Sequence, residues 1–250
     1  MTVLAITGPS TGHALVFLHG AGANLGMWHP QVERLSGRFR CIGVDLPGHG
    51  QNRTSRFTLE RSVEEVAGVV DEHAAGSATL VGLSLGAYVG IAMAAAHPGR
   101  VDGLVSSGAG VEFQGLTAWV NRSQGLVFPL AGPLVKPLAR KSLAKIAPPG
   151  TDEAMEERGG MSLRGAGDAL RDLAGRDFRS MLTQYSGPVL ALMGVRDKHN
   201  VTALPAMIEG MDNVEVEIIQ DGGHSCSLSQ PDAFSDAVRR FVTRNQSAAT

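Results

Sequence analysis

The chain has 250 residues, of which 43% are hydrophobic and 18% are charged, and its formal net charge at pH 7 is −2. These values are typical of a globular domain, and without a basic excess we expect no nucleic-acid partner. No apolar run reaches the ~18 residues of a membrane span, and the first residues lack the pattern of a signal peptide. With only Cys41 and Cys226 as cysteines, we expect no disulfide framework, no integral membrane segment and a cytoplasmic location.

Short apolar runs alternate with segments of helical periodicity along most of the chain. The alternation predicts parallel strands joined by crossover helices, and continuous apolar runs are typical of strands that are covered on both faces. We expect strands at residues 3–6, 14–19, 40–45, 78–83, 101–106, 189–194 and 214–219. We expect helices at residues 28–35, 59–73, 84–96, 201–211 and 232–243. The predicted fold class is α/β, with a mostly parallel central sheet flanked by helices.

Residues 111–185 break this alternation. They carry no strand pattern, only helical stretches interrupted by Gly and Pro, and they include the flexible-looking segment RGGMSLRGAGDAL. An insertion of this length in a compact domain favours a helical cap or lid over a structureless loop. We therefore predict a core formed by residues 1–110 and 186–250, with a cap at residues 111–185.

One part of the predicted cap alternates basic and apolar side chains at helical spacing. This pattern predicts a solvated amphipathic helix over the site. A sharper interpretation is a lid that makes weak interfacial contact with lipid-like or anionic substrates. The basic residues are Lys136, Arg140, Lys141 and Lys145, and the apolar residues are Val135, Leu138 and Ile146.

The segment VGLSLGAYVG places Ser84 between Gly82 and Gly86, where a predicted strand meets a predicted helix. A sharp turn of this kind exposes a nucleophile, and its neighbours must be small because backbone segments approach closely there. The chain contains 32 glycines, so the match needs support from elsewhere in the sequence. A serine nucleophile requires a base, normally a histidine that a carboxylate orients.

His224 and Asp197 are the candidate partners of Ser84. Each follows a predicted strand, so both lie at the carboxyl edge of the sheet, where Ser84 also projects. The chain order Ser, Asp, His is that of one serine hydrolase fold. Asp221 is a competing carboxylate, but it precedes His224 by only three residues. Asp102 begins a strand at the opposite edge of the sheet and is therefore excluded as the carboxylate that orients His224.

Five segments in this order resemble motifs of the α/β-hydrolase fold superfamily over nearly the whole chain. They are LVFLHGAGAN, GVDLPGHGQN, VGLSLGAYVG, MGVRDKHN and GGHSCSL. The resemblance implies an oxyanion hole made of the backbone N–H groups of Ala21 and Leu85. It also implies a structural role for His19 in holding its loop, and turn-stabilising roles for Asp45 and His49.

Asn24, Trp28 and His199 are candidates for the substrate pocket. The stretch around Trp28 is similar to one in enol-lactonase-like members, although a helix-packing tryptophan fits the pattern equally well. His199 is either a pocket residue or a solvated loop histidine. The sequence holds no H-E-x-x-H, paired C-x-x-C or phosphate-loop pattern, so no metal and no cofactor are expected.

These motifs predict a serine hydrolase that cleaves a small or medium carboxylic ester, a small-molecule substrate, through an acyl-enzyme intermediate. Hydrolysis of a C–C bond, a lactone or a thioester by the same triad is the alternative within enzymes. A hydrolase-like ligand receptor that retains the triad is the alternative of another class. The fold cannot choose among these, because function depends on the site and its pocket.

Overall fold

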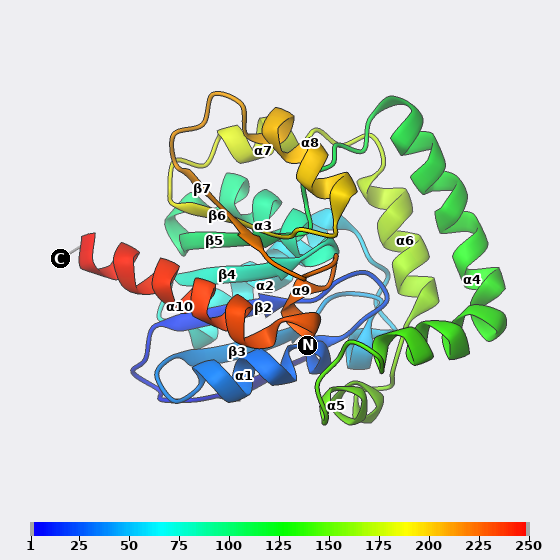
Figure 1. Cartoon of the computed structure of the whole chain (residues 1–250), viewed down its shortest axis with the longest axis horizontal. Coiled ribbons are helices and arrows are strands. Elements are labelled where there is room, and N and C mark those ends of the chain that lie inside the picture. Colours follow the sequence, from blue (N-terminus) through cyan, green and yellow to red (C-terminus); the bar gives the residue numbers. More distant parts are fainter. Residues whose placement is uncertain (1–2, 249–250) are drawn as a thin grey trace.

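The computed structural model describes the backbone of residues 3–248 and the side chains of residues 4–129 and 137–247. Within them, seven strands form one sheet in the order β1-β3-β2-β4-β5-β6-β7 (Figure 1). β1 runs antiparallel to β3, and the other neighbouring pairs are parallel. The strands are β1 Val3–Thr7, β2 Ala14–Leu18, β3 Arg40–Asp45, β4 Ala78–Leu83, β5 Val101–Ser107, β6 Val189–Gly194 and β7 Val214–Ile219.

Helices follow the strands and cover both faces of the sheet (Figure 1). Those of the core are α1 His29–Leu35, α2 Leu59–His73, α3 Leu85–Ala96, α8 Lys198–Ile208, α9 Cys226–Ser229 and α10 Pro231–Ala248. Those between β5 and β6 are α4 Gly115–Leu143, α5 Thr151–Glu157, α6 Leu163–Leu173 and α7 Phe178–Thr183. Short 3₁₀ turns lie at Leu25–Trp28, Gly50–Asn52 and Pro98–Arg100. The predicted α/β class with a mostly parallel sheet is confirmed.

Alternate side chains of the strands enter two hydrophobic layers. In β2, Val16 and Leu18 pack toward α2 and α3, whereas Leu15 and Phe17 pack toward α1 and α10. Every residue of β2, β4 and β6 is buried. This explains the continuous apolar runs in the sequence, because both faces of these strands are covered by helices.

Three helices differ from the sequence prediction, and one of them, α10, continues to Ala248 where the prediction ended at residue 243. The helix expected at residues 201–211 is α8, which begins directly after Asp197 and ends before Gly210, a glycine with φ of +79°. α4 is a single helix although Pro129 and Pro137 lie inside it. A proline removes one backbone hydrogen bond and bends a helix without always ending it, and α4 changes direction along its length (Figure 1).

The segment between β5 and β6 is helical, and α4 and α6 lie side by side (Figure 1). The sequence RGGMSLRGAGDAL, expected to be flexible, contains the first eight residues of α6. The helix forms there because Ser162 accepts a hydrogen bond from the Gly165 N–H as an N-cap, and because Leu163 and Ala166 are buried. No helix in the described part of the chain is long and apolar enough to cross a membrane.

Candidate active site

Ser84 lies between β4 and α3 in a backbone conformation that few residues adopt. Its φ is +52° and its ψ is −113°. Strain of this kind costs about 1–3 kcal/mol and persists only where the surrounding structure holds it. Here the Ser84 N–H donates to the carbonyl of Ser107, while the Ser84 carbonyl accepts from the N–H groups of Ala87 and Tyr88. The turn is therefore fixed from both sides.

The glycines beside Ser84 are required by close backbone contacts. A Cβ at Gly86 would lie 2.0 Å from the carbonyl oxygen of Leu18, and one at Gly82 would lie 2.5 Å from the Ala87 nitrogen. Neither position has room for a side chain. The sharp turn inferred from the sequence is thus a steric requirement of how β2, β4 and α3 pack.

Asp197 and His224 form a close pair at the carboxyl edge of the sheet. The Nδ1 atom of His224 lies 2.7 Å from Oδ2 of Asp197, whose side chain is 9% exposed. The competing carboxylate, Asp221, instead forms an exposed ion pair with Arg196. The structure therefore brings Asp197, and not Asp221, to His224.

Asn200 is a third member of this polar group, and the sequence motifs did not reveal it. Its Nδ2 donates to Asp197 Oδ2 over 3.0 Å and lies 3.5 Å from His224 Nδ1. Its Oδ1 accepts from the Gly110 N–H over 2.9 Å, which fixes the orientation of the amide. Its position three residues after Asp197, one helical turn along α8, could have indicated that the two side chains are in contact.

The loop after β2 approaches Ser84 from the side of Ala21. A Cβ at Gly20 would lie 3.9 Å from the Cβ of Ser84. Leu85 is the first residue of α3, so its N–H belongs to the helical donors that have no acceptor within the helix. The helix dipole at this end also favours negative charge. These features bring backbone donors of two chain segments near the serine.

Buried polar side chains hold this loop in place. His19 accepts from the Leu46 N–H over 3.1 Å, and its other ring nitrogen lies 2.9 Å from the Gly20 carbonyl. Burial lowers the pKa of His19 to about 4, so the ring is neutral near pH 7. Asp45 accepts from the N–H groups of Leu25 and Gln51, and burial raises its pKa despite these bonds. These contacts fit the structural roles expected for His19 and Asp45.

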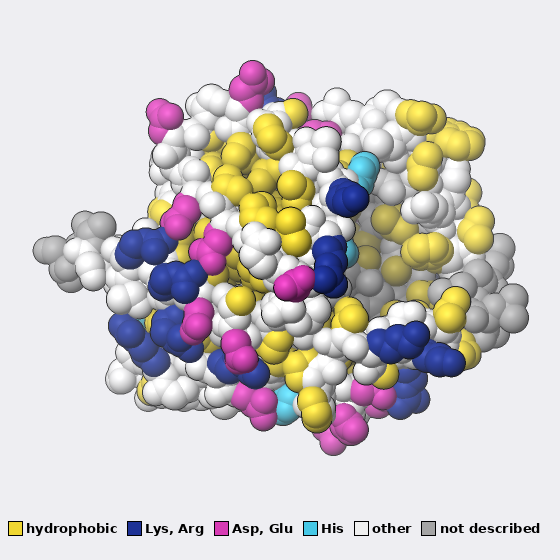
Figure 2. Space-filling view, viewed as in Figure 1, with side chains coloured by type: hydrophobic (Ala, Val, Ile, Leu, Met, Phe, Trp, Pro, Cys, Tyr) yellow, Lys and Arg dark blue, Asp and Glu magenta, His cyan; other side chains and the backbone are white. Residues whose placement is uncertain are grey.

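Two cavities meet at Ser84 and His224, which line both of them. The larger, of about 510 Å³, lies toward α4 and α8, and the smaller, of about 360 Å³, lies along the loop that contains Ala21. Further residues of the larger cavity include Tyr88, Phe113, Leu116, Val120, Leu170 and His199. Further residues of the smaller cavity include Met27, Leu143, Ile146, Met155, Met161 and Leu228. Figure 2 shows a hollow beside α4 with histidine side chains at its rim.

His199 lines the larger cavity, whereas Asn24 and Trp28 line neither of these two cavities. Trp28 is fully buried against Phe17 and Phe234, which is the helix-packing alternative. Asn24 is also buried. Its amide donates to the carbonyls of Met155 and Gly160 and thereby ties the loop after β2 to the segment that contains α5.

Tyr88 is a further residue that the motifs did not identify. It lies one helical turn after Ser84 in α3 and lines the larger cavity. Its hydroxyl donates to the Val111 carbonyl over 2.7 Å, and its ring contacts Phe113 and Phe178. Tyr88 thus joins the floor of the cavity to the start of the helical insertion and to α7.

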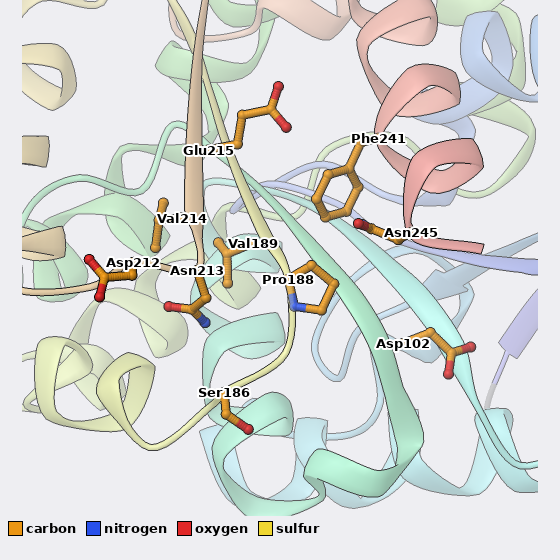
Figure 3. A pocket seen from close by; sticks show the side chains of 10 residues that line it. All are labelled: Asp102, Ser186, Pro188, Val189, Asp212, Asn213, Val214, Glu215, Phe241 and Asn245. Atoms are coloured by element: carbon orange, nitrogen blue, oxygen red, sulfur yellow. The ribbon is translucent and has the colours of Figure 1, made fainter. Parts of the chain in front are cut away.

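A cavity of about 620 Å³ lies at the other end of the strands (Figure 3). Its lining includes Asp102 together with the first residues of β6 and β7, so it is remote from Ser84. Asp102 is accordingly far from His224, as expected. Among the residues that the structure describes, no group of three His, Cys, Asp or Glu side chains is arranged to hold a metal ion.

The chain is similar to known proteins over most of its length. The model of the alpha/beta hydrolase family matches residues 15–237. A pimeloyl-[acyl-carrier protein] methyl ester esterase of Yersinia enterocolitica is 28% identical, over 92% of this chain and 93% of its own length. The 3-oxoadipate enol-lactonase 2 of Acinetobacter baylyi is 25% identical, over 96% of this chain and 92% of its own. A thermophilic esterase of Thermogutta terrifontis superposes with a TM-score of 0.79 at 24% identity, covering 98% of this chain and 93% of the other.

Proposed function

The chain belongs to the alpha/beta hydrolase family, and we propose that it hydrolyses a carboxylic ester of small or medium size through an acyl-enzyme intermediate on Ser84. One observation carries the proposal. A serine on a strained strand-to-helix turn and a histidine paired with a largely buried carboxylate line the same two cavities.

In this mechanism Ser84 attacks the acyl carbon while His224 takes the hydroxyl proton. Asp197 holds the proton on Nδ1 of the histidine, so that Nε2 is the base, and stabilises the imidazolium that forms. His224 then protonates the leaving alcohol and activates the water that releases the acid. The chemistry needs no group beyond these side chains and the backbone.

The backbone N–H groups of Ala21 and Leu85 are proposed to bind the oxyanion of the tetrahedral intermediate. Their support is the free N-terminal donor of α3 and the close approach of the Gly20 loop to Ser84. One such donor is worth about 2.7–4 kcal/mol in the transition state. Since both are backbone groups, changing either side chain leaves the donor in place.

The two cavities support a substrate with an arm on each side of the scissile bond. Their walls are mostly apolar, with amide and hydroxyl groups in the larger one from Thr117, Asn121 and Gln124. One cavity would hold the acyl part and the other the alcohol part. His199 would contact whichever part occupies the larger cavity.

The relatives support an ester and also favour a lactone as the second candidate. Their names specify a methyl ester in one case and an enol-lactone in the other. A lactone is a cyclic ester, so the same attack and the same oxyanion donors serve both reactions. Thioester and C–C substrates would use the same triad and are distinguished by assay.

Two further proposals concern the cellular location of the protein and its contact with an interface. We propose a cytoplasmic location, which is supported by two buried cysteines that remain free thiols. We also propose interfacial contact through the cap, taken as residues 111–185. Support for this contact comes from large apolar side chains exposed on α4.

Turnover measurements with p-nitrophenyl esters of increasing acyl length test the proposal. We expect sustained multiple turnover by the wild type and none above background by Ser84→Ala. A single slow turnover with tight retention of the ligand would instead identify a receptor. Parallel assays with a lactone, an acyl thioester and a β-diketone rank the alternative bonds by kcat/KM.

A further inference from the structure

The outer face of α4 exposes large apolar side chains that a globular surface normally covers. We define this outer face as Leu116, Trp119, Val120, Leu126 and Val127. Leu116 is 76% exposed, Trp119 66% and Leu126 63%. Hydrophobic side chains are visible over α4 at the upper right of Figure 2. Contiguous exposure of this kind marks an interaction surface.

Helical geometry separates three faces of α4. At about 100° per residue, the five side chains of the outer face fall within an arc of roughly 120°. The opposite side packs on α6, where a Cβ at Gly125 would lie 2.6 Å from the carbonyl oxygen of Gly167. The third side, with Asn121 and Gln124, forms a wall of the larger cavity. The outer face is therefore not needed for packing within the chain.

The outer face is continuous with the cavity beside Ser84. Leu116 and Val120 belong to both, because they are exposed and also line that cavity. An apolar path thus leads from the exterior of α4 toward the nucleophile. A partner that covers the outer face also lies at the entrance of the cavity.

The charge of α4 complements an anionic surface. The helix contains no Asp or Glu, and its basic residues are Arg122, Lys136, Arg140 and Lys141. The Arg122 guanidinium donates to the Ala174 carbonyl after α6, and the side chain of Lys136 lies outside the described residues. Arg140 pairs with Asp152 and Glu156, but Lys141 and the following Lys145 are exposed and make no ion pair with the described residues. A second copy of the chain would bring like charges together and would cover the entrance at Leu116. An anionic lipid surface avoids the repulsion between like charges, and although it also covers the entrance, an apolar ester dissolved in it reaches the entrance directly.

We propose that the outer face of α4 docks on an anionic phospholipid bilayer and that apolar esters enter the larger cavity from there along Leu116 and Val120. Trp119 and the leucines enter the interfacial layer, while Lys141 and Lys145 contact the head groups, as in other amphipathic interfacial helices. The docking stands on its own observations. The entry of substrate rests on the proposed function.

Tryptophan fluorescence measures the docking directly, because the chain has two tryptophans and Trp28 is fully buried. The full-length protein is titrated with vesicles of phosphatidylglycerol and phosphatidylcholine, or of phosphatidylcholine alone, and co-sedimentation is measured in parallel. We expect a blue shift of Trp119 emission and co-sedimentation with the anionic vesicles, both reduced by salt. Leu126→Glu and Val127→Glu should each weaken binding by about tenfold or more.

The matched control is Val216→Glu, which changes an exposed apolar residue on β7 and should leave vesicle binding unchanged. Binding that Leu126→Glu and Val127→Glu do not reduce, or no binding to anionic vesicles, would overturn the proposal. A dimer in sedimentation velocity that Leu126→Glu dissociates would also overturn it, since the occupant would then be a second copy.

Hydrolysis of p-nitrophenyl acetate separates this proposal from the proposed function. Leu126 lines neither cavity, so Leu126→Glu should hydrolyse this soluble ester at the wild-type rate. If the wild type binds vesicles but does not hydrolyse any ester, the proposed function fails and the docking remains. If it hydrolyses soluble esters without binding vesicles, the docking fails alone.

Discussion

Asn200 connects three parts of the site at the scale of a single residue. Its amide joins Asp197 to the Gly110 backbone and lies beside His224. Hydrogen bonds to charged groups contribute about 1.5–3 kcal/mol. We therefore expect Asn200→Ala to lower kcat for a p-nitrophenyl ester by about 10- to 100-fold with a smaller change in KM.

A double-mutant cycle distinguishes positioning from general destabilisation. Asp197→Asn alone should lower kcat by about 10⁴-fold, and adding Asn200→Ala should then cost little, because the carboxylate that Asn200 orients is gone. Additive losses would show that Asn200 acts independently of Asp197. Asn200→Asp keeps the acceptor for the Gly110 N–H but turns a second carboxylate toward Asp197, so it should lower kcat although the contact with Gly110 is retained.

His19 and His49 make stability depend on pH. Burial lowers the pKa of His19 to about 4 and that of His49 to about 3, whereas both are near 6.5 in the unfolded chain. The unfolded state therefore binds more protons below pH 6.5, and the free energy of unfolding should fall as the pH decreases from about 6.5 toward 4. Urea denaturation at several pH values measures this slope.

The control for this pH dependence is His19→Gln, which retains an acceptor for the Leu46 N–H without a titratable ring. It should show a smaller loss of stability between pH 6.5 and 4 than the wild type. An unchanged slope in this variant would mean that His19 is not protonated preferentially in the unfolded state.

At the scale of single residues, the sequence predicts the position of a site residue where a local strand pattern determines it. Ser84, Asp197 and His224 each follow a recognisable strand, so their meeting at one sheet edge could be predicted. Trp28 and Asn24 could not be assigned in this way. Their partners, Phe234 and Met155, lie more than a hundred residues away in the sequence, and only the fold brings them together.

At the scale of elements, α4 and the loop after β2 both line the smaller cavity, and the N-terminal part of α4 also lines the larger one. Of the two cavities at Ser84, Val120 of α4 lines the larger and Met161, before α6, lines the smaller. We expect Val120→Trp and Met161→Trp to narrow different arms of the substrate site. One variant should lower kcat/KM for esters with long acyl chains, and the other should lower it for esters of bulky alcohols. The measurement is kcat/KM over a series of acyl lengths and a series of alcohols.

Leu138→Trp is the matched control, because Leu138 is on α4 but is exposed and lines neither cavity. Its ester profile should equal that of the wild type. If both cavity variants altered only the acyl series, the alcohol part would have to lie outside the two cavities.

The boundaries of most elements followed from the sequence, but the form of the insertion did not. Strands of the sheet are continuous apolar runs, which local composition reveals. α4 continues through Pro129 and Pro137, and α6 forms in a segment rich in glycine. The two helices pack closely at Gly125 and Gly167, a tertiary contact that outweighs low helix propensity. The division into a core and a cap at residues 111–185 stays a prediction.

At the scale of the whole molecule, the order of the parallel strands places the ends of β4, β6 and β7 at one edge. The loops that follow them carry Ser84, Asp197 and His224. Because parallel strands end at the same edge of a sheet, this arrangement is predictable from the alternation of strands and helices. The antiparallel pairing of β1 with β3 was not predictable, because its short edge strand carries no signal of direction.

Titration with a fluorophosphonate tests directly whether Ser84 is the nucleophile of an ester hydrolase. Peptide mass mapping locates the label while residual p-nitrophenyl ester hydrolysis is measured in the same sample. We expect one label per chain on Ser84, no label in Ser84→Ala, and activity that falls linearly to zero as labelling approaches one per chain. Labelling that persists in Ser84→Ala, or full activity after complete labelling of Ser84, would contradict this assignment.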